Sequence, residues 1–233
     1  MTSIRDALSE FLAEAGEGKR RSMSPPSRVI DLFGTYLDNY GYEGLNAFER
    51  MRLDKESDDD TQFSDFFDPG HIQPFHINSF LNTFVIRKFM GTKGFLKACG
   101  PVMKKLASWL FEKGHWDEDA MRYYREIAGD NATVDLVGCD ELTRALVGYV
   151  DSHPVDDEVG DLGDDDYHDD QLTIKKVESR KIFFDAILES EEDIVISLPK
   201  SVTCKAKEGW SVTMEVARIE GNWRILGLGN VYP

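Results

Sequence analysis

Residues 151–170, DSHPVDDEVGDLGDDDYHDD, divide the chain into two parts with different sequence patterns. This stretch contains ten Asp or Glu residues and neither Lys nor Arg. Charge repulsion and low hydrophobicity predict an extended segment here instead of a packed one. We therefore expect an acidic linker at 152–170, with one domain before it at 28–151 and a second after it at 171–233.

Apolar and polar residues alternate after the linker, which is typical of strands with one buried face. Glu220-Gly221-Asn222 predicts a hairpin turn within this part. A sheet of this size buries its apolar face best by closing on itself. We therefore predict a five-stranded antiparallel β-barrel of the SH3-like type, with an OB-like barrel as the alternative. Its strands are expected at 172–177, 182–188, 194–198, 212–216 and 223–226.

Apolar residues before the linker recur every three or four positions, the period of amphipathic α-helices. The first of these helices is followed by a connector rich in Gly, Pro and Ser, so 1–27 is expected to form an N-terminal helix and a flexible connector. The predicted fold class is α+β with two domains, an all-α helical bundle followed by the small barrel. Helices are expected at 3–14, 29–40, 44–53, 76–90, 92–113, 118–128 and 140–151.

Charge is distributed unevenly in this chain, whose net charge is −16. The segment from His71 to His115 holds seven Lys or Arg residues and one acid, whereas 116–170 holds three Arg and eighteen acids. If 92–113 is a single helix, three of its lysines lie within about 40° of one another around the axis. Such a stripe can neutralise phosphates. The candidate nucleic-acid-binding residues are Arg87, Lys88, Lys93, Lys97, Lys104 and Lys105.

Two kinds of partner are compatible with this basic surface. The first is double-stranded DNA, whose phosphates attract lysine and arginine without regard to sequence. The second is an acidic protein or peptide, or the acidic linker of the same chain, which would make the protein an adaptor for protein–protein interactions. A solvated surface with no partner is the remaining alternative.

Three segments carry a resemblance to a known family: VIDLFGTYLDNYG at 29–41, HINSFLNTFVIRK at 76–88 and VMKKLASWLFEKG at 102–114. Together they make residues 28–129 resemble the N-terminal SAM-like core-binding domain of phage integrases and other tyrosine recombinases. In that family the domain clamps DNA through its helices and precedes a catalytic domain with arginines, a histidine pair and a nucleophilic tyrosine. No Arg-x-x-His or His-x-x-Arg pattern follows Gly129. The resemblance therefore implies contact with DNA but no recombinase activity.

No pattern of catalytic or metal-binding residues stands out. His71 and His76 match no zinc-ligand spacing, and the three cysteines, Cys99, Cys139 and Cys204, are too far apart in sequence to form one. The aspartate-rich stretch lacks the alternating ligands of a calcium loop. We therefore predict a binding protein that is not an enzyme and has no cofactor or metal.

Aromatic residues in the predicted barrel suggest a second binding surface. SH3-like barrels bind peptides or nucleic acid in aromatic grooves, so Trp210, Trp223 and Tyr232 are candidates for a barrel binding face, with core packing as the alternative. No apolar run approaches the roughly 18 residues that span a membrane. The first twelve residues also do not form a signal peptide. We accordingly expect a cytoplasmic protein without a membrane partner.

Overall fold

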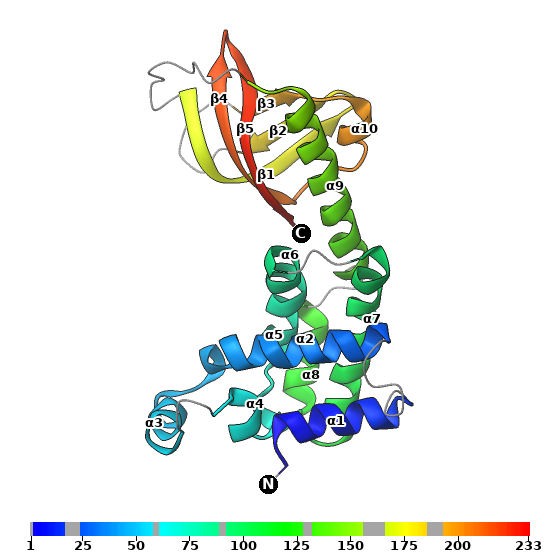
Figure 1. Cartoon of the computed structure of the whole chain (residues 1–233), viewed down its shortest axis with the longest axis vertical. Helices are drawn as coiled ribbons and strands as arrows, with labels where there is room; N and C mark the ends of the chain where they lie inside the picture. Colours follow the sequence, from blue (N-terminus) through cyan, green and yellow to red (C-terminus); the bar gives the residue numbers. More distant parts are fainter. Residues whose placement is uncertain are drawn as a thin grey trace. The chain divides into compact units, whose positions relative to one another are not determined.

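The structure is a computed structural model, and it describes residues 2–16, 24–57, 61–88, 92–127, 132–155, 166–185 and 193–233. The chain forms two compact units, Met1–Val134 and Asp135–Pro233, which are described separately below (Figure 1). The first unit is helical, and the second contains a five-stranded antiparallel sheet. The predicted order, a helical part followed by five strands, is confirmed.

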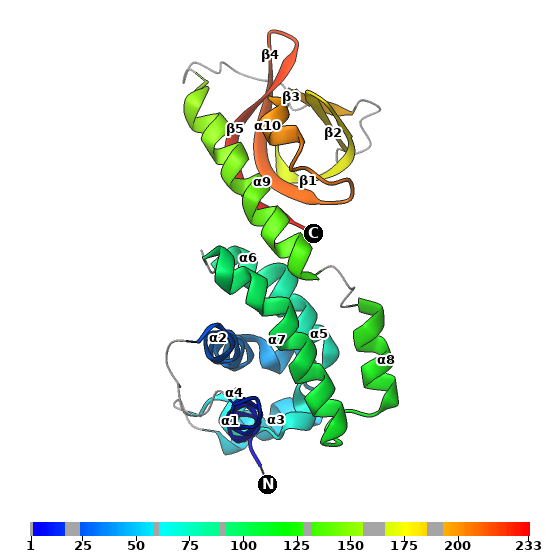
Figure 2. The same ribbon diagram turned by 90° about the vertical axis from the view of Figure 1, so that its right-hand side faces the viewer.

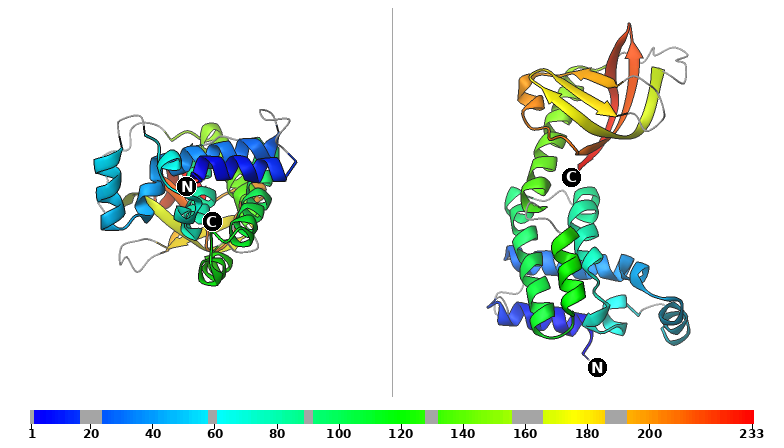
Figure 3. Two further views of the ribbon diagram at one scale, coloured as in Figure 1. Left: turned by 90° about the horizontal axis from the view of Figure 1, so that it is seen from below. Right: turned by 180° about the vertical axis from the view of Figure 1, so that it is seen from behind.

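The first unit is built from helices α1 to α8. Helices α1 and α2 lie side by side, because both run across Figure 1 and both are seen end-on in Figure 2. Helix α7 packs against α2 and also against α8, which runs beside it in the right-hand view of Figure 3. Their bounds are α1 Ile4–Glu14, α2 Pro25–Tyr40, α3 Ala47–Glu56, α4 Phe63–Phe66, α5 Pro74–Ser79, α6 Val85–Lys88, α7 Lys93–Glu112 and α8 Glu118–Ile127.

Side-chain caps explain where several of these helices begin. The Ser3 hydroxyl accepts a hydrogen bond from the backbone N–H of Asp6 at 3.1 Å, so α1 begins one residue later. Ser24 caps α2 in the same way, and Pro25 occupies the first helical position, where its missing N–H costs nothing. Thr92 caps α7. These caps place the helix starts within a few residues of the predicted ones.

The core of the first unit is rich in aromatic rings. Phe33 of α2 and Phe80, which follows α5, meet edge-to-face with centroids 5.2 Å apart, and both are fully buried. Trp116 donates from its indole N–H to the carbonyl of Ile72 at 2.6 Å, so its polar atom is satisfied inside the core. The predicted apolar faces of α1, α2 and α7 therefore do form the core.

The second unit combines one long helix, α9 (Ala132–Ser152), with an antiparallel sheet in the order β3-β2-β1-β4-β5. The first half of β1 pairs with β4 and the second half with β2. Glu220 and Gly221 have φ of 50° and 76°, so they form the predicted two-residue hairpin turn. The strands are β1 Tyr167–Glu178, β2 Lys181–Asp185, β3 Ile194–Ser197, β4 Ser211–Ile219 and β5 Asn222–Tyr232, and a short α10 spans Lys200–Thr203.

The prediction of a closed barrel is wrong. In the described residues the sheet ends at β3 on one side and β5 on the other, without a ladder between them. Helix α9 instead lies along the sheet and contributes Cys139, Leu142 and Leu146 to the sheet's apolar core (Figure 2). The sheet buries its face under a helix that the sequence pattern had placed in the other domain. The boundary between the units accordingly falls at 134/135 and not at 151.

Two further expectations at this junction differ from the structure. The predicted helix at 140–151 begins earlier, at Ala132, so Asp140 lies inside the helix and pairs with Arg144 one turn later at 2.9 Å. The predicted linker 152–170 includes Tyr167–Asp170, which are the first residues of β1. Its residues 156–165 lie outside the described part of the chain.

Candidate nucleic-acid interface

Helix α7 has one apolar side and one basic side. It runs without interruption through Pro101, which lies exposed on the outer side. Because the helix is continuous, Lys93, Lys97 and Lys104 lie within about 40° of one another, as the predicted stripe requires. All three side chains are exposed, and so is Lys105. The opposite side buries Phe95, Leu96, Cys99, Val102, Met103, Leu106, Ala107, Trp109 and Leu110.

Four of the six predicted cations make no ion pair with a described residue. Arg87, Lys88, Lys97 and Lys105 make no salt bridge within 4.0 Å to any residue that the structure describes. Lys113, at the end of α7, is a clear contrast, because its ammonium group contacts Glu10 at 2.8 Å and Glu14 at 2.6 Å. These two carboxylates raise the pKa of Lys113. On α7, Lys97 and Lys105 are therefore not neutralised by any described residue, whereas Lys113 at the end of the helix is.

An apolar groove that the sequence did not predict lies beside the basic side of α7. Its volume is about 570 Å³, and it is formed between α1 and α7. Trp109 is held there by an indole N–H that donates to Glu14 at 2.7 Å and by an edge-to-face contact with Phe11 at 5.9 Å. Lys104 and Lys105 also line the groove. The groove depends on a pairing between helices that are about ninety residues apart in sequence, which no local pattern reveals.

The predicted aromatic face of the barrel is not assembled. Trp210 is buried in the core of the second unit, where its ring lies against Gly138 of α9, so it presents no surface for a partner. Trp223 and Tyr232 are half-buried and lie near opposite ends of β5, paired with Arg218 and Ser211 respectively. Trp223 lines a pocket of about 340 Å³ that does not include Tyr232. The structure therefore does not bring the three aromatic residues together.

His76, Cys99 and Cys139 are buried side chains of the two cores. His76 is buried and accepts a hydrogen bond at Nδ1 from the N–H of Gln73 at 3.0 Å, and burial lowers its pKa to about 4. Burial also raises the pKa of Cys99 to about 12 and that of Cys139 well above its ordinary value, so neither thiol is a ready nucleophile. No group of three potential ligands is suitable for a metal ion within the described residues.

Comparison with known proteins gives no support for a family. No family model, curated protein or solved structure matches the chain. The resemblance of 28–129 to the recombinase core-binding domain therefore stays a prediction. Within the described part of the chain, no helix is both long enough and apolar enough to traverse a lipid bilayer.

Proposed function

We propose that this chain is a non-enzymatic binding protein whose helical unit binds the phosphate backbone of double-stranded DNA through the basic side of α7. One observation carries the proposal. Lys93, Lys97 and Lys104 are exposed on the same side of an uninterrupted helix, opposite a side that is entirely apolar. A straight row of ammonium groups suits a backbone of evenly spaced phosphates.

The local charge supports this choice despite the acidic chain. DNA senses the charges near its own surface, because salt screens interactions beyond a Debye length of about 8 Å at physiological ionic strength. Lys105 lies beside the stripe, and Arg87 and Lys88 end α6 shortly before α7 begins. The six cations can therefore contact phosphates while the acids elsewhere are screened. Contacts of this kind position a protein on DNA but do not select a base sequence.

A charge-reversal variant with a matched control tests the proposal. In the full chain, K93E/K97E/K104E should weaken binding to a fluorescently labelled duplex at low salt by at least about tenfold, because three phosphate contacts are lost. The control is K181E/K200E/K205E, which changes the net charge by the same amount at exposed positions in the second unit. The measurement is fluorescence anisotropy, with circular dichroism to verify that both variants fold.

The control separates a local contact from a general charge effect. A loss in the α7 variant and at most about a threefold change in the control support the proposed surface. Equal losses in the two variants would show that only net charge matters, and unchanged binding in both would exclude α7 as the site.

A second candidate function is suggested by the acidic segment. Six of the ten residues at 156–165 are Asp or Glu, so this segment can imitate phosphates and compete for the same lysines. Replacing these acids by Asn and Gln keeps the length of the segment. If the segment or an acidic protein partner is the natural ligand of α7, this variant should bind DNA more tightly, and the gain should disappear in K93E/K97E/K104E. Unchanged affinity would eliminate the competition.

A further inference from the structure

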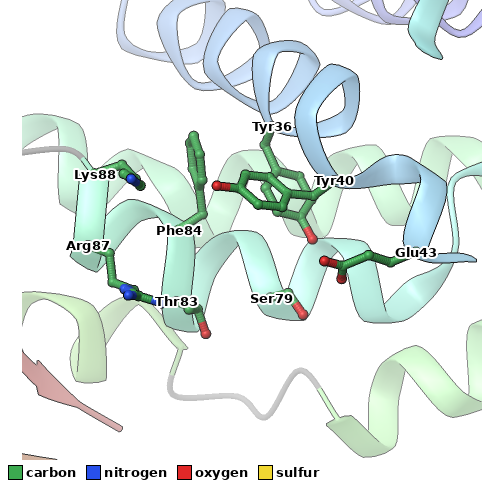
Figure 4. Close-up of a pocket in the computed structure, with 8 residues that line it drawn as sticks. All are labelled: Tyr36, Tyr40, Glu43, Ser79, Thr83, Phe84, Arg87 and Lys88. Carbon is green, nitrogen blue, oxygen red and sulfur yellow. The ribbon is translucent and has the colours of Figure 1, made fainter.

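A pocket of about 240 Å³ lies in the first unit where the end of α2 meets α5 and α6 (Figure 4). Between α5 and α6 the chain makes a π-helical turn, Phe80–Phe84, a feature that is rare and frequently found at functional sites. The sequence pattern had predicted one regular helix here. The pocket is lined by Tyr36, Tyr40, Glu43, Ser79, Thr83, Phe84, Arg87 and Lys88.

The hydroxyl of Tyr36 is the strongest sign that this pocket holds a ligand. Its side chain belongs to the core, with 3% of the residue exposed, yet the hydroxyl makes no hydrogen bond within 3.5 Å to a described residue and interacts only at longer range with Ser79, which also lines the pocket. Buried hydroxyls are nearly always paired, because an unpaired one loses its hydrogen bonds to water without replacement. Burial raises the pKa of Tyr36 to about 12, so the hydroxyl is neutral and can donate. Because less than 1 Å² of the hydroxyl oxygen is accessible, a ligand oxygen in the pocket would satisfy it after a movement of a lining side chain such as Ser79.

The charges of the pocket lie at opposite ends. Figure 4 shows Glu43 near Ser79 and, at the other end, Arg87 and Lys88. Arg87 follows Ser79 by eight residues, with the π-helical turn Phe80–Phe84 between them. None of the three charged side chains makes a salt bridge within 4.0 Å to a described residue. The pocket therefore offers an anion site at one end and an acceptor for N–H groups at the other.

The middle of the pocket offers aromatic rings that are partly open. Tyr40 and Phe84 are half-buried, and their centroids are 5.8 Å apart in an edge-to-face arrangement. Tyr36 stacks on Tyr40 at 5.5 Å, which fixes the orientation of the Tyr40 ring. Such surfaces bind planar rings by stacking or edge contact. The volume of about 240 Å³ is slightly below the range of roughly 300–1,000 Å³ typical of drug-sized ligands, so a mononucleotide would fill the pocket and leave part of its surface in solvent.

We propose that this pocket binds a nucleoside monophosphate. The phosphate would contact Arg87 and Lys88, the base would lie against Tyr40 and Phe84, and an exocyclic amine would donate to Glu43, as carboxylates accept from the amine of cytosine. An oxygen of the base or sugar would accept from the Tyr36 hydroxyl. Arg87 and Lys88 are shared with the proposed DNA surface, but Lys93, Lys97 and Lys104 do not line the pocket, so loss of the α7 lysines tests the DNA proposal without removing the nucleotide site.

Calorimetric titration of the full chain with CMP tests the site. Cytidine and inorganic phosphate should each bind at least about tenfold more weakly than CMP, because each leaves one end of the pocket unmatched. UMP should also bind more weakly, since it presents a carbonyl in place of the amine that faces Glu43. E43Q should reduce the preference for CMP over UMP.

Three variants connect binding to the geometry. R87Q/K88Q should abolish measurable CMP binding, and Tyr36→Phe should weaken it about fivefold while keeping the ring and the core. K97Q removes a cation outside the pocket and should leave the affinity unchanged. K93E/K97E/K104E should likewise keep CMP binding, so that failure of the DNA proposal and failure of this one can be distinguished.

Several results would overturn the proposal. They are no heat of binding with CMP up to about 10 mM, equal affinities for CMP and inorganic phosphate, or CMP binding that survives both R87Q/K88Q and Tyr36→Phe. Tyr36→Phe preserves the size of the side chain, and its folding can be verified by thermal unfolding. A loss of CMP binding in that variant with an unchanged melting temperature supports the site.

Discussion

Each of the two units is organised by one long helix, and the two helices differ in what they offer on their outer sides. Helix α7 has 20 residues and exposes a row of lysines, of which Lys97 makes no salt bridge to a described residue. Helix α9 has 21 residues and pairs Asp140 with Arg144 within its own surface at 2.9 Å. Both use apolar residues at helical spacing to reach a core. The comparison shows that regularly spaced apolar residues determine which side of a helix is buried, whereas the charges on its outer side determine what it can bind.

The two helices also differ in the kind of surface that they cover. Helix α7 packs on other helices, mainly α2 and α8. Helix α9 packs on a sheet, and Gly138 lets it approach Trp210 closely, because a Cβ at this position would lie 2.4 Å from the indole ring. The spacing of apolar residues along α9 does not show whether the helix packs on other helices or on a sheet. Three predictions below test how separate the two helices and their units are.

The largest expected effect comes from truncating one core leucine in each helix. Leu106→Ala in α7 and Leu142→Ala in α9 should each cost roughly 2–5 kcal/mol of stability, because both side chains are fully buried. Hydrogen exchange of the full chain should show lost protection in α2 and α8 for the first variant and in β1 and β4 for the second. If Leu142→Ala instead loosened α2, the assignment of α9 to the sheet would be incorrect.

Lowering the pH should destabilise the first unit because His76 becomes protonated. Its folded pKa is about 4 and its unfolded pKa about 6.5, so the unfolded chain binds the proton more readily. The stability that neutral His76 contributes is complete above pH 6.5 and is lost as the pH falls towards 4. At pH 5 the loss is about 2 kcal/mol relative to pH 7.

A variant isolates this effect from other titrating groups. His76→Gln should be less stable than the wild-type protein at pH 7, and the difference should shrink by about 2 kcal/mol at pH 5. Hydrogen exchange in α5 measures it, with β1 of the second unit as internal reference. The same difference at both pH values would show that His76 does not titrate as its burial requires.

Alanine substitutions at two glycines of α9 should change stability by the smallest amounts, and in opposite directions. Gly138→Ala should destabilise the second unit by about 1 kcal/mol, because the clash with Trp210 outweighs the gain in helix propensity. Gly148→Ala has open space around it and should stabilise the same helix by about 0.5–1 kcal/mol. Thermal unfolding of the two variants measures both. Stabilisation by Gly138→Ala would mean that α9 does not lie against Trp210.

The sequence predicted what depends on local periodicity. The starts of α1 and α7 and the five strands follow from caps and from apolar spacing. The prediction that Lys93, Lys97 and Lys104 lie on the same side needed only the assumption that 92–113 is one helix. These properties need only the residues of one segment.

The sequence could not predict what depends on distant partners. The open sheet follows from α9 covering a face that the barrel prediction closed by itself. Core packing and a binding face were both open for Trp210, and it is buried because Gly138, more than seventy residues earlier, leaves room for its ring. The pocket proposed to bind a nucleotide requires Tyr36 of α2 to lie beside the π turn at Phe80–Phe84. A π turn shifts the later residues to another side of the helix, so a regular helical spacing does not predict which of them share a side.

The salt dependence of DNA binding tests the central claim most directly. For the full chain and a short duplex, the dissociation constant should be measured by anisotropy between about 50 and 200 mM salt. If the six cations contact phosphates, the slope of log affinity against log salt should be roughly −5, and K93E/K97E/K104E should reduce its magnitude by about 3. A slope near zero, or no binding even at the lowest salt, would contradict a phosphate-binding role for α7.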